Sequence, residues 1–169
     1  MDVIHVQVQP DHLDTLARTK PMAAMAELVW NALDAEATQV RISFEENQLG
    51  GVEAVRITDN GHGLHRDDAA RVFSNLGGSW KRSGQQSLVR RRVLHGQYGK
   101  GRFRAFSLGQ RAVWDTVFES EGEHWRYWIT GDAAQPSRFL LSPAAPAGDM
   151  ACGMTVSIEN PYTAVDLLR

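Results

Sequence analysis

The second half of the chain reads as a succession of β-strands, and this pattern constrains the fold more than any other. β-Branched and aromatic residues are frequent in four stretches separated by turns or loops, at 111–119, 123–130, 137–142 and 154–159. Strands that follow one another through short connections pair with their neighbours in an antiparallel sheet. A doubly wound parallel fold would alternate strands with helices, so this half of the sequence argues against it.

The first half of the chain mixes helices with strands. Pro21 suits the first turn of a helix, and apolar residues keep helical spacing from Met22 to about Ala37. The further elements predicted are strands at 39–44 and 52–58, joined by a turn at 48–51, and short helices at 66–73 and 103–108. Residues 3–8 form either a short strand or an N-terminal arm. These elements predict an α+β fold, a two-layer sandwich in which helices cover one face of a mixed, mostly antiparallel sheet.

The composition is that of one globular domain. The 169 residues are 43% hydrophobic and 22% charged, which is ordinary for a folded domain of this size. The single cysteine, Cys152, cannot form an internal disulfide. No apolar run is long enough to span a membrane, and the N-terminus lacks the features of a signal peptide. We therefore expect a single domain over residues 1–169 in a reducing, cytoplasmic setting, with no membrane partner.

Residues 75–100 form a polar, Gly- and Ser-rich stretch without sustained periodicity. A loop of this length inside a compact domain is usually functional or mobile, and we expect a flexible lid. Eight of the eighteen basic residues fall between Lys81 and Arg104, and no acid interrupts them. Two interpretations of this positive segment remain open: a solvated basic loop, or attraction of a triphosphate or of nucleic acid.

A first polar motif lies on the predicted helix after Pro21. Glu27 and Asn31 are four residues apart and so project from the same face, and Asp34 follows within the next turn. Burying such groups on an otherwise apolar helix is costly unless they have partners. A carboxylate that accepts a proton from water, beside an amide oxygen that binds Mg²⁺, would supply a reason. The alternative is a surface helix with Glu27 and Asp34 in solvent.

A second motif, Asp59-Asn60-Gly61-His62-Gly63, closes the strand predicted at 52–58. A carboxylate at the end of a buried strand can accept a hydrogen bond from an exocyclic amine such as that of adenine. Gly61 and Gly63 permit positive φ angles and close approach of the backbone to a flat ligand. Taken alone, the motif is also a common turn.

A third motif, Gly96-Gln-Tyr-Gly99-Lys100-Gly101, precedes the helix predicted at 103–108. Small residues before a helix start leave backbone N–H groups free to bind an anion, and Lys100 adds a cation. The motif is not a Walker A loop, because the Gly-Lys-Ser/Thr ending is absent.

The order of these motifs resembles that of the GHKL ATPases, a family that includes DNA gyrase B, the ninety-kilodalton heat-shock chaperones, histidine kinases and MutL. Residues 26–38 are similar to the first motif of MutL, whereas 74–83 and 96–106 look more like the heat-shock chaperones. A fourth element, Gly153-Met-Thr155-Val156, matches the late strand whose threonine lies near the adenine in that family. The resemblance spans about residues 22–159 and implies the two-layer Bergerat fold.

The resemblance implies ATP and Mg²⁺ as ligands and assigns roles around them. Glu27 would be the general base that polarises the attacking water, and Asn31 would bind Mg²⁺. Asp59 would hydrogen-bond the adenine amino group, with Thr155 supporting it through a water. The remaining assignments are Asp34 as an orienting group, Gly61, Gly63 and Leu64 against the base, Asn75 and Lys81 in the lid, and Gly99, Lys100 and Gly101 at the phosphates. Lys100 stands where the chaperones usually carry an apolar residue, so simple solvent exposure is its alternative.

Three functions follow from this resemblance. The first is an ATPase that couples nucleotide binding to lid closure and to dimerisation of a larger protein. The second is a module that senses ATP or ADP without significant turnover. The third is a histidine kinase catalytic domain, against which Glu27 and the Asn-Ala-Leu-Asp-Ala sequence from Asn31 argue.

The C-terminal stretch bears on turnover. Residues 160–169 look like the start of a helix or of a linker to a downstream domain. In the resembled family that domain supplies a cation to the γ-phosphate, so an isolated domain would hydrolyse ATP slowly. A natural single-domain protein is the alternative. A homodimer is expected of the full-length, ATP-bound form, and the sequence leaves open whether nucleic acid is a partner.

Overall fold

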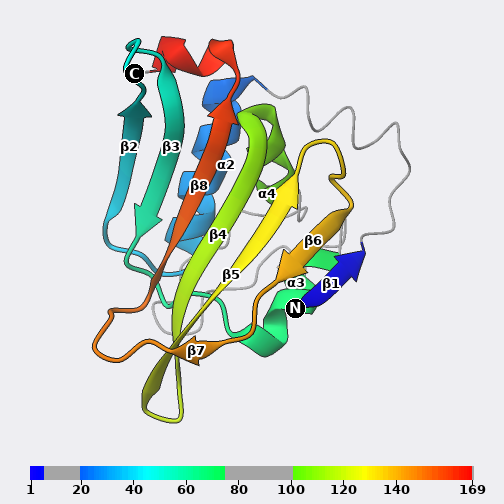
Figure 1. Cartoon of the computed structure of the whole chain (residues 1–169). Coiled ribbons are helices and arrows are strands. Elements are labelled where there is room, and N and C mark those ends of the chain that lie inside the picture. Colours follow the sequence, from blue (N-terminus) through cyan, green and yellow to red (C-terminus); the bar gives the residue numbers. More distant parts are fainter. Residues whose placement is uncertain (6–19, 75–100, 169) are drawn as a thin grey trace.

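The computed structural model describes residues 1–5, 20–74 and 101–168, and within them the molecule has two layers (Figure 1). One layer is an eight-stranded sheet in the order β1-β6-β5-β4-β8-β3-β2, with β7 paired to β5. Every pairing between the described strands is antiparallel. The strands are β1 (Asp2–His5), β2 (Val40–Glu46), β3 (Val52–Asp59), β4 (Gly109–Ser120), β5 (Glu123–Asp132), β6 (Arg138–Leu141), β7 (Ala145–Pro146) and β8 (Gly153–Pro161).

The second layer consists of helices that cover one face of the sheet (Figure 1). The helical elements are α2 (Pro21–Asp34), α3 (Arg66–Ser74), α4 (Gly101–Arg104) and the 3₁₀ helices η1 (Ala105–Ser107) and η2 (Thr163–Leu168). The predicted α+β sandwich is therefore confirmed. No helix in residues 1–5, 20–74 and 101–168 has the length and apolar character needed to cross a membrane.

Helix α2 begins as predicted and ends earlier than predicted. Pro21 occupies its first turn, where a missing N–H costs nothing, and the buried apolar residues recur every three to four positions. The prediction that the helix reaches Ala37 is wrong. The Ala35 N–H still bonds to the Asn31 carbonyl at 3.0 Å, but Glu36 has a φ of 64°, a left-handed conformation that terminates the helix.

The core lies between the sheet and the helices. Alternate residues of the central strands face the helices, as in Val55 and Ile57 of β3. Phe139 of β6 is the centre of an aromatic cluster, with ring centroids 5.0–6.0 Å away, whose other members are Phe73, Phe103, Phe106 and Trp114. Such pairs stabilise a core by about 0.5–1.5 kcal/mol each beyond burial. The cluster ties α3, α4 and η1 to the sheet.

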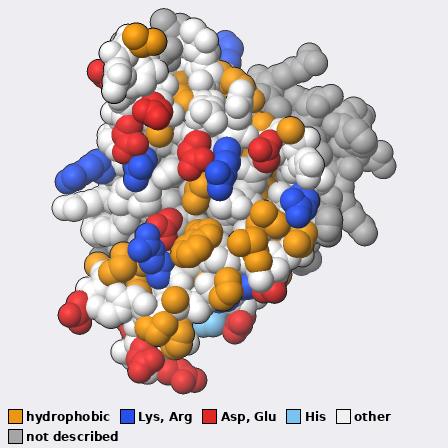
Figure 2. Space-filling model, in the orientation of Figure 1, with side chains coloured by type: hydrophobic (Ala, Val, Ile, Leu, Met, Phe, Trp, Pro, Cys, Tyr) orange, Lys and Arg blue, Asp and Glu red, His pale blue; other side chains and the backbone are white. Residues whose placement is uncertain are grey.

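The opposite face of the sheet is solvated, as antiparallel sheets allow. Figure 2 looks onto this face and shows acidic and basic side chains lying beside each other across the strands. The ion pairs there are Arg56–Glu45 at 2.7 Å, Arg126–Asp115 at 2.5 Å and Arg111–Glu159 at 3.3 Å. Functional groups on the helix-facing side are therefore separated from this surface by the thickness of the sheet.

Two local predictions need correction. The single helix predicted at 103–108 is instead α4 followed by η1, because the Ser107 hydroxyl donates to the Arg104 carbonyl at 2.7 Å and competes with an α-helical bond. The connection between the strands predicted at 137–142 and 154–159 is not entirely a loop, because it contains β7, which pairs with Trp125 and Arg126. Pro146 is tolerated in β7 because a short strand at a sheet edge does not need every N–H. The lid prediction for 75–100 lies outside the described residues.

Candidate functional site

The polar face of α2 is partly exposed at Glu27 and Asn31 and becomes buried at Asp34. Glu27, Asn31 and Asp34 recur at spacings of four and three residues and so share a face. The Glu27 side chain is 30% exposed, Asn31 is half-buried, and Asp34 is buried. A surface helix with Asp34 in solvent is therefore the wrong interpretation of this motif. Burying a carboxylate at the end of a core helix costs free energy, which indicates a role for the group.

The C-terminal end of α2 contacts the glycine turn that follows β3. The His62 N–H donates to the Ala35 carbonyl at 3.0 Å. A Cβ atom added to Gly61 would lie 2.5 Å from the same carbonyl oxygen, so only glycine fits there. The first and second motifs, separated in sequence by a helix end and a two-stranded hairpin, thus form one continuous surface.

Asn60 holds this junction from the other side. Its side-chain oxygen accepts the N–H groups of Thr38 and Gln39 at 2.9 and 2.8 Å. Its amide donates to the Thr38 hydroxyl at 2.8 Å. Asn60 therefore fastens the connection between α2 and β2 to the end of β3, which is a structural role and not a binding role.

Asp59 ends β3 with its carboxylate half-buried. One oxygen accepts the Gly61 N–H at 2.8 Å. Burial raises the pKa of Asp59 above its ordinary value, although the N–H groups of Gly61 and Met154 and the nearby His62 oppose the rise. A desolvated carboxylate with one oxygen already held by the backbone can offer its remaining acceptor sites to a donor of defined geometry.

The register of the sheet decides which residues surround Asp59. Asp59 pairs with Met154 of β8, which pairs with Thr116 of β4, which pairs with Tyr127 of β5. Paired residues project from the same face, so these four form a row on the helix-facing side. We call Asp59, Met154, Thr116 and Tyr127 the Asp59 row.

Thr155 lies on the opposite face of the sheet. It pairs with Thr58, and the two hydroxyl oxygens are 3.0 Å apart. Successive residues of a strand point to opposite faces, so the structure does not bring Thr155 to Asp59. The prediction that Thr155 supports the group bound by Asp59 therefore needs correction, and the side chain beside Asp59 on β8 is the half-buried Met154.

Two members of the Asp59 row that the sequence did not single out, Thr116 and Tyr127, hold the segment after Asp59 through hydrogen bonds. The hydroxyl of Thr116 accepts the Leu64 N–H at 2.9 Å, and the Tyr127 hydroxyl donates to the Leu64 carbonyl at 3.1 Å. Burial raises the pKa of Tyr127, so this hydroxyl stays a donor. The only sequence signal was a hydroxyl-bearing side chain on the core-facing side of each strand, which the alternation in β4 and β5 would have located.

Gly63 lets this segment approach the sheet. Its φ is +70°, and a Cβ atom there would lie 2.1 Å from the Val117 carbonyl oxygen. A side chain at this position is therefore excluded both by conformation and by space. The positive φ predicted for the glycine turn is confirmed at Gly63, whereas Gly61 is required for close packing.

Glu27 forms an ion pair with Arg104, the last residue of α4. The distance from Arg104 Nη1 to Glu27 Oε1 is 2.5 Å, and the two side chains are 26% and 30% exposed. Arg104 Nε is buried and has no hydrogen-bond partner among the described residues. The region that follows the third motif thus meets the helix of the first motif through side chains.

The remaining predicted residues are placed only in part. Asn75, Lys81, Gly99 and Lys100 lie outside the described residues, and Gly101 begins α4. Within residues 1–5, 20–74 and 101–168 no group of three or more His, Cys, Asp or Glu side chains could hold a metal ion.

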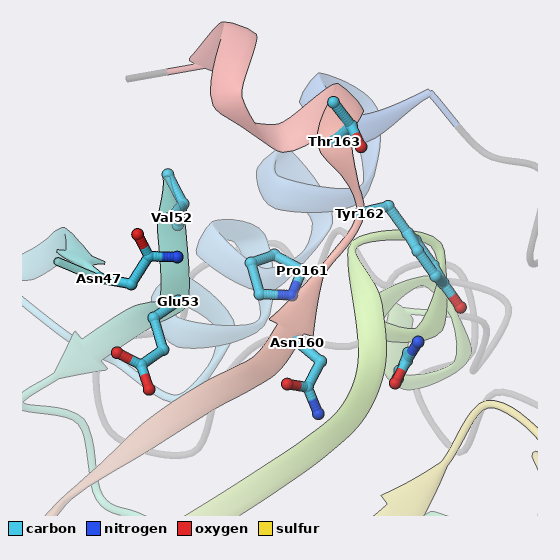
Figure 3. A pocket seen from close by; sticks show the side chains of 8 residues that line it. Asn47, Val52, Glu53, Asn160, Pro161, Tyr162 and Thr163 are labelled. Carbon is cyan, nitrogen blue, oxygen red and sulfur yellow. The ribbon is translucent and has the colours of Figure 1, made fainter. Parts of the chain in front are cut away.

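A hollow of about 570 Å³ lies at the other end of the sheet and is lined by Asn47, Val52, Glu53, Gln110, Asn160, Pro161, Tyr162 and Thr163 (Figure 3). Val52 begins β3 and Asp59 ends it, so this hollow and Asp59 are about 23 Å apart at roughly 3.3 Å per residue. The hollow is therefore separate from the site that the motifs form.

The chain matches one family model and several curated relatives. Residues 19–148 match the family described as histidine kinase-, DNA gyrase B-, and HSP90-like ATPase. The DNA mismatch repair protein MutL of Thiobacillus denitrificans is 30% identical over 148 residues, which are 85% of this chain and 22% of that protein. MutL of Acidobacterium capsulatum is 42% identical over 70 residues, covering 41% of this chain and 10% of that protein. MutL of an Exiguobacterium species is 44% identical over 54 residues, covering 32% of this chain and 8% of that protein. The chain thus matches less than a quarter of the length of each of these relatives.

Proposed function

The chain belongs to the histidine kinase-, DNA gyrase B- and HSP90-like ATPase family, and from that premise we propose that it binds ATP with Mg²⁺ and hydrolyses it. One observation carries the proposal: three segments distant in sequence, the turn after β3, strand β8 and helix α4, meet α2 or Asp59. The backbone after Asp59 bonds to the end of α2, β8 places Met154 beside Asp59, and α4 brings Arg104 to Glu27. A nucleotide has a base at one end and phosphates at the other, and the proposal assigns Asp59 to the base and Glu27 to the phosphate end.

Asp59 is proposed to select the base. Its half-buried carboxylate would accept a hydrogen bond from the adenine amino group, while the backbone of Gly61, Gly63 and Leu64 packs against the base. Guanine carries a carbonyl oxygen in place of that amine, which would put two acceptors opposite each other. A buried acceptor left without a donor is costly, so ATP should bind more tightly than GTP.

Glu27 is proposed as the general base. Its carboxylate is partly exposed on the helix that also carries Asn31, so it can accept a proton from a water beside a bound phosphate. Asn31 would hold Mg²⁺ through its amide oxygen, and the buried Asp34 would orient its neighbours. The chemistry that Mg²⁺ supplies when bound is neutralisation of phosphate charge. The predicted phosphate contacts of Gly99, Lys100 and Gly101, and the lid contacts of Asn75 and Lys81, belong to the same proposal.

The proposal extends to a larger protein. Because the relatives are several times longer than this chain, we propose that nucleotide binding here drives lid closure and homodimerisation of a longer, cytoplasmic protein. The name of those relatives, DNA mismatch repair protein, makes nucleic acid the first partner to test.

A nucleotide-sensing module is the second candidate, and the ion pair between Glu27 and Arg104 favours it. A guanidinium 2.5 Å from one carboxylate oxygen fixes how Glu27 is turned, so its free acceptor sites can be held away from a water beside the phosphate. Binding without turnover would follow if this pair persisted with ATP bound.

Calorimetric titration with ATP, ADP and GTP in the presence of Mg²⁺ tests the proposal. We expect ATP to bind at least about tenfold more tightly than GTP, and Asp59→Asn to weaken ATP binding by about tenfold, or about 1.4 kcal/mol. Asp67→Asn is the matched control, because the Asp67 side chain is 89% exposed. Equal affinity for ATP and GTP would refute the role of Asp59. Phosphate release no faster than that of Glu27→Gln would leave the sensing module as the function.

A further inference from the structure

The backbone of Arg104 is firmly anchored, whereas its guanidinium is incompletely bonded. Its backbone is anchored because the neighbouring Phe103 and Phe106 are buried in the aromatic cluster around Phe139, and Ser107 donates to its carbonyl. Its side chain remains 26% exposed. The side chain can therefore change partners without any movement of the helix that carries it.

The hydrogen bonds of Arg104 leave room for a second anion. A guanidinium has five N–H donors in a planar fork. One nitrogen, Nη1, bonds to Glu27, whereas Nε is buried without a partner among the described residues. Buried donors in folded proteins are nearly always satisfied, so an orphaned N–H beside an ion pair calls for a ligand. Phosphate oxygens, like carboxylate oxygens, match the planar fork of a guanidinium.

The position of Arg104 follows from that of Glu27. If Glu27 acts on the water that attacks the γ-phosphate, a cation 2.5 Å from its carboxylate is within reach of the same phosphate. The carboxylate carries one negative charge and the triphosphate carries several. A guanidinium between them is attracted more strongly to the phosphates, and its departure releases the Glu27 oxygen.

We propose that Arg104 is a phosphate-binding residue with two alternative partners: Glu27 in the nucleotide-free protein and the phosphates of ATP in the bound protein. This inference rests on the proposed function. The exchange has two consequences at once, because it frees the carboxylate of Glu27 and supplies a cation to the phosphates from within this domain. The ion pair of the nucleotide-free protein is thereby replaced by a contact between Arg104 and the phosphates when ATP is bound.

A double-mutant cycle tests the exchange. The wild type, Glu27→Gln, Arg104→Gln and the double variant are titrated by calorimetry with one non-hydrolysable ATP analogue and Mg²⁺. We expect Glu27→Gln to tighten binding about fivefold, because Arg104 no longer has to leave a carboxylate. In that background Arg104→Gln should weaken binding about thirtyfold, as loss of a charged hydrogen bond does. In the wild-type background the loss should be only about sixfold, because the cost of leaving Glu27 disappears with Arg104.

Two outcomes overturn the inference. No effect of Arg104→Gln in the Glu27→Gln background would mean that the guanidinium never reaches the phosphates. Equal losses in both backgrounds would mean that Arg104 binds phosphate without leaving Glu27. Removal of the Glu27 charge alone would change the affinity equally with and without Arg104. It would therefore not produce the expected difference between the two backgrounds.

Controls separate this inference from the proposed function and from misfolding. Arg111→Gln removes the same charge from the other face of the sheet, where Arg111 pairs with Glu159 at 3.3 Å, and should leave the affinity unchanged. Arg104→Lys is a second variant in case Arg104→Gln is poorly folded. It keeps the charge without the fork, so its affinity for the ATP analogue should lie between those of the wild type and Arg104→Gln. Binding that depends on Asp59 but not on Arg104 would refute only the exchange. No binding by the wild type would refute the proposed function, and this inference with it.

Discussion

The two ends of the site are built in different ways. At the Asp59 end, backbone groups make the contacts: the Ala35 and Leu64 carbonyls and the N–H groups of Gly61 and Leu64 all have partners at 2.8–3.1 Å. At the Glu27 end, a single side-chain ion pair joins α2 to α4. Backbone bonds inside a packed core have one arrangement, whereas two long side chains have several. On the proposed function, the Asp59 end would be organised before ATP arrives, whereas the Glu27 end would be organised by ATP.

Glu27→Gln tests this contrast with the largest expected effect. It should lower the rate constant of ATP hydrolysis by about 10²–10⁴-fold, the usual contribution of a general base, without weakening ATP binding. Single-turnover phosphate release and calorimetry on the same protein give the two quantities. Parallel loss of both would mean that Glu27 is part of the binding surface, and the contrast between the two ends would fail.

Gly63→Ala should disrupt the packing of the segment after Asp59 against the sheet. A methyl group 2.1 Å from the Val117 carbonyl, on a residue with a φ of +70°, forces the segment off the sheet, and we expect a loss of about 3 kcal/mol or more in the free energy of unfolding. Gly122→Ala is the matched control, since its φ is +80° but nothing lies within 4 Å, and should cost only about 1 kcal/mol. Urea unfolding compares them. Similar losses for the two variants would mean that space at Gly63 does not matter.

Thr116→Val tests whether the hydrogen bond from the Leu64 N–H to Thr116 is needed for ATP binding. The substitution keeps the shape of the side chain and leaves the Leu64 N–H without its acceptor, so we expect about 1–3 kcal/mol of lost stability. ATP affinity should fall as well, because the backbone that lines the base position loosens. Thr116→Ser restores the hydroxyl and should recover most of both losses. Unchanged ATP affinity in Thr116→Val would show that the Asp59 end tolerates more movement than its bonds indicate.

The pH dependence of stability should report the burial of Asp59 with the smallest effect. The folded-state pKa is raised above the ordinary 3.8, so between these two values the folded protein binds a proton that the unfolded chain releases. Stability contributed by Asp59 therefore falls as the pH rises from 3.8 through the folded pKa, and is constant above it. Urea unfolding of the wild type and Asp59→Asn over this range gives the difference. A difference that does not change with pH would mean that the carboxylate is not desolvated.

Elements with a strong local pattern were predicted well. The start of α2, the strands β2 to β5 and β8, and α3 follow from spacing and turn residues that act over a few positions. Predictions failed where the bounds or the existence of an element depend on one special backbone conformation or on a contact with a residue distant in sequence. The end of α2 depends on the left-handed Glu36, and the short strand β7 exists only because β5 is there to pair with it.

The candidate site shows the same division. Glu27, Asn31 and Asp59 stand out in sequence because polar groups in apolar elements are costly and therefore informative. Thr155 was assigned from a motif, and only the pairing of Asp59 with Met154 reveals that its hydroxyl faces away. Thr116 and Tyr127 carry no motif, so their contact with Leu64 is invisible until β4 and β5 are placed in register.

The sequence by itself determined the family and the two-layer architecture and predicted the chemical groups of the candidate site, because these depend on residue type and on spacing along one element. Only the tertiary structure decided which groups meet. It paired Glu27 with Arg104, seventy-seven residues away, put Met154 beside Asp59 and turned Thr155 outward. A register shift of one residue reverses the face of every side chain in a strand. Register is set by the whole sheet, and no local stretch of sequence contains it.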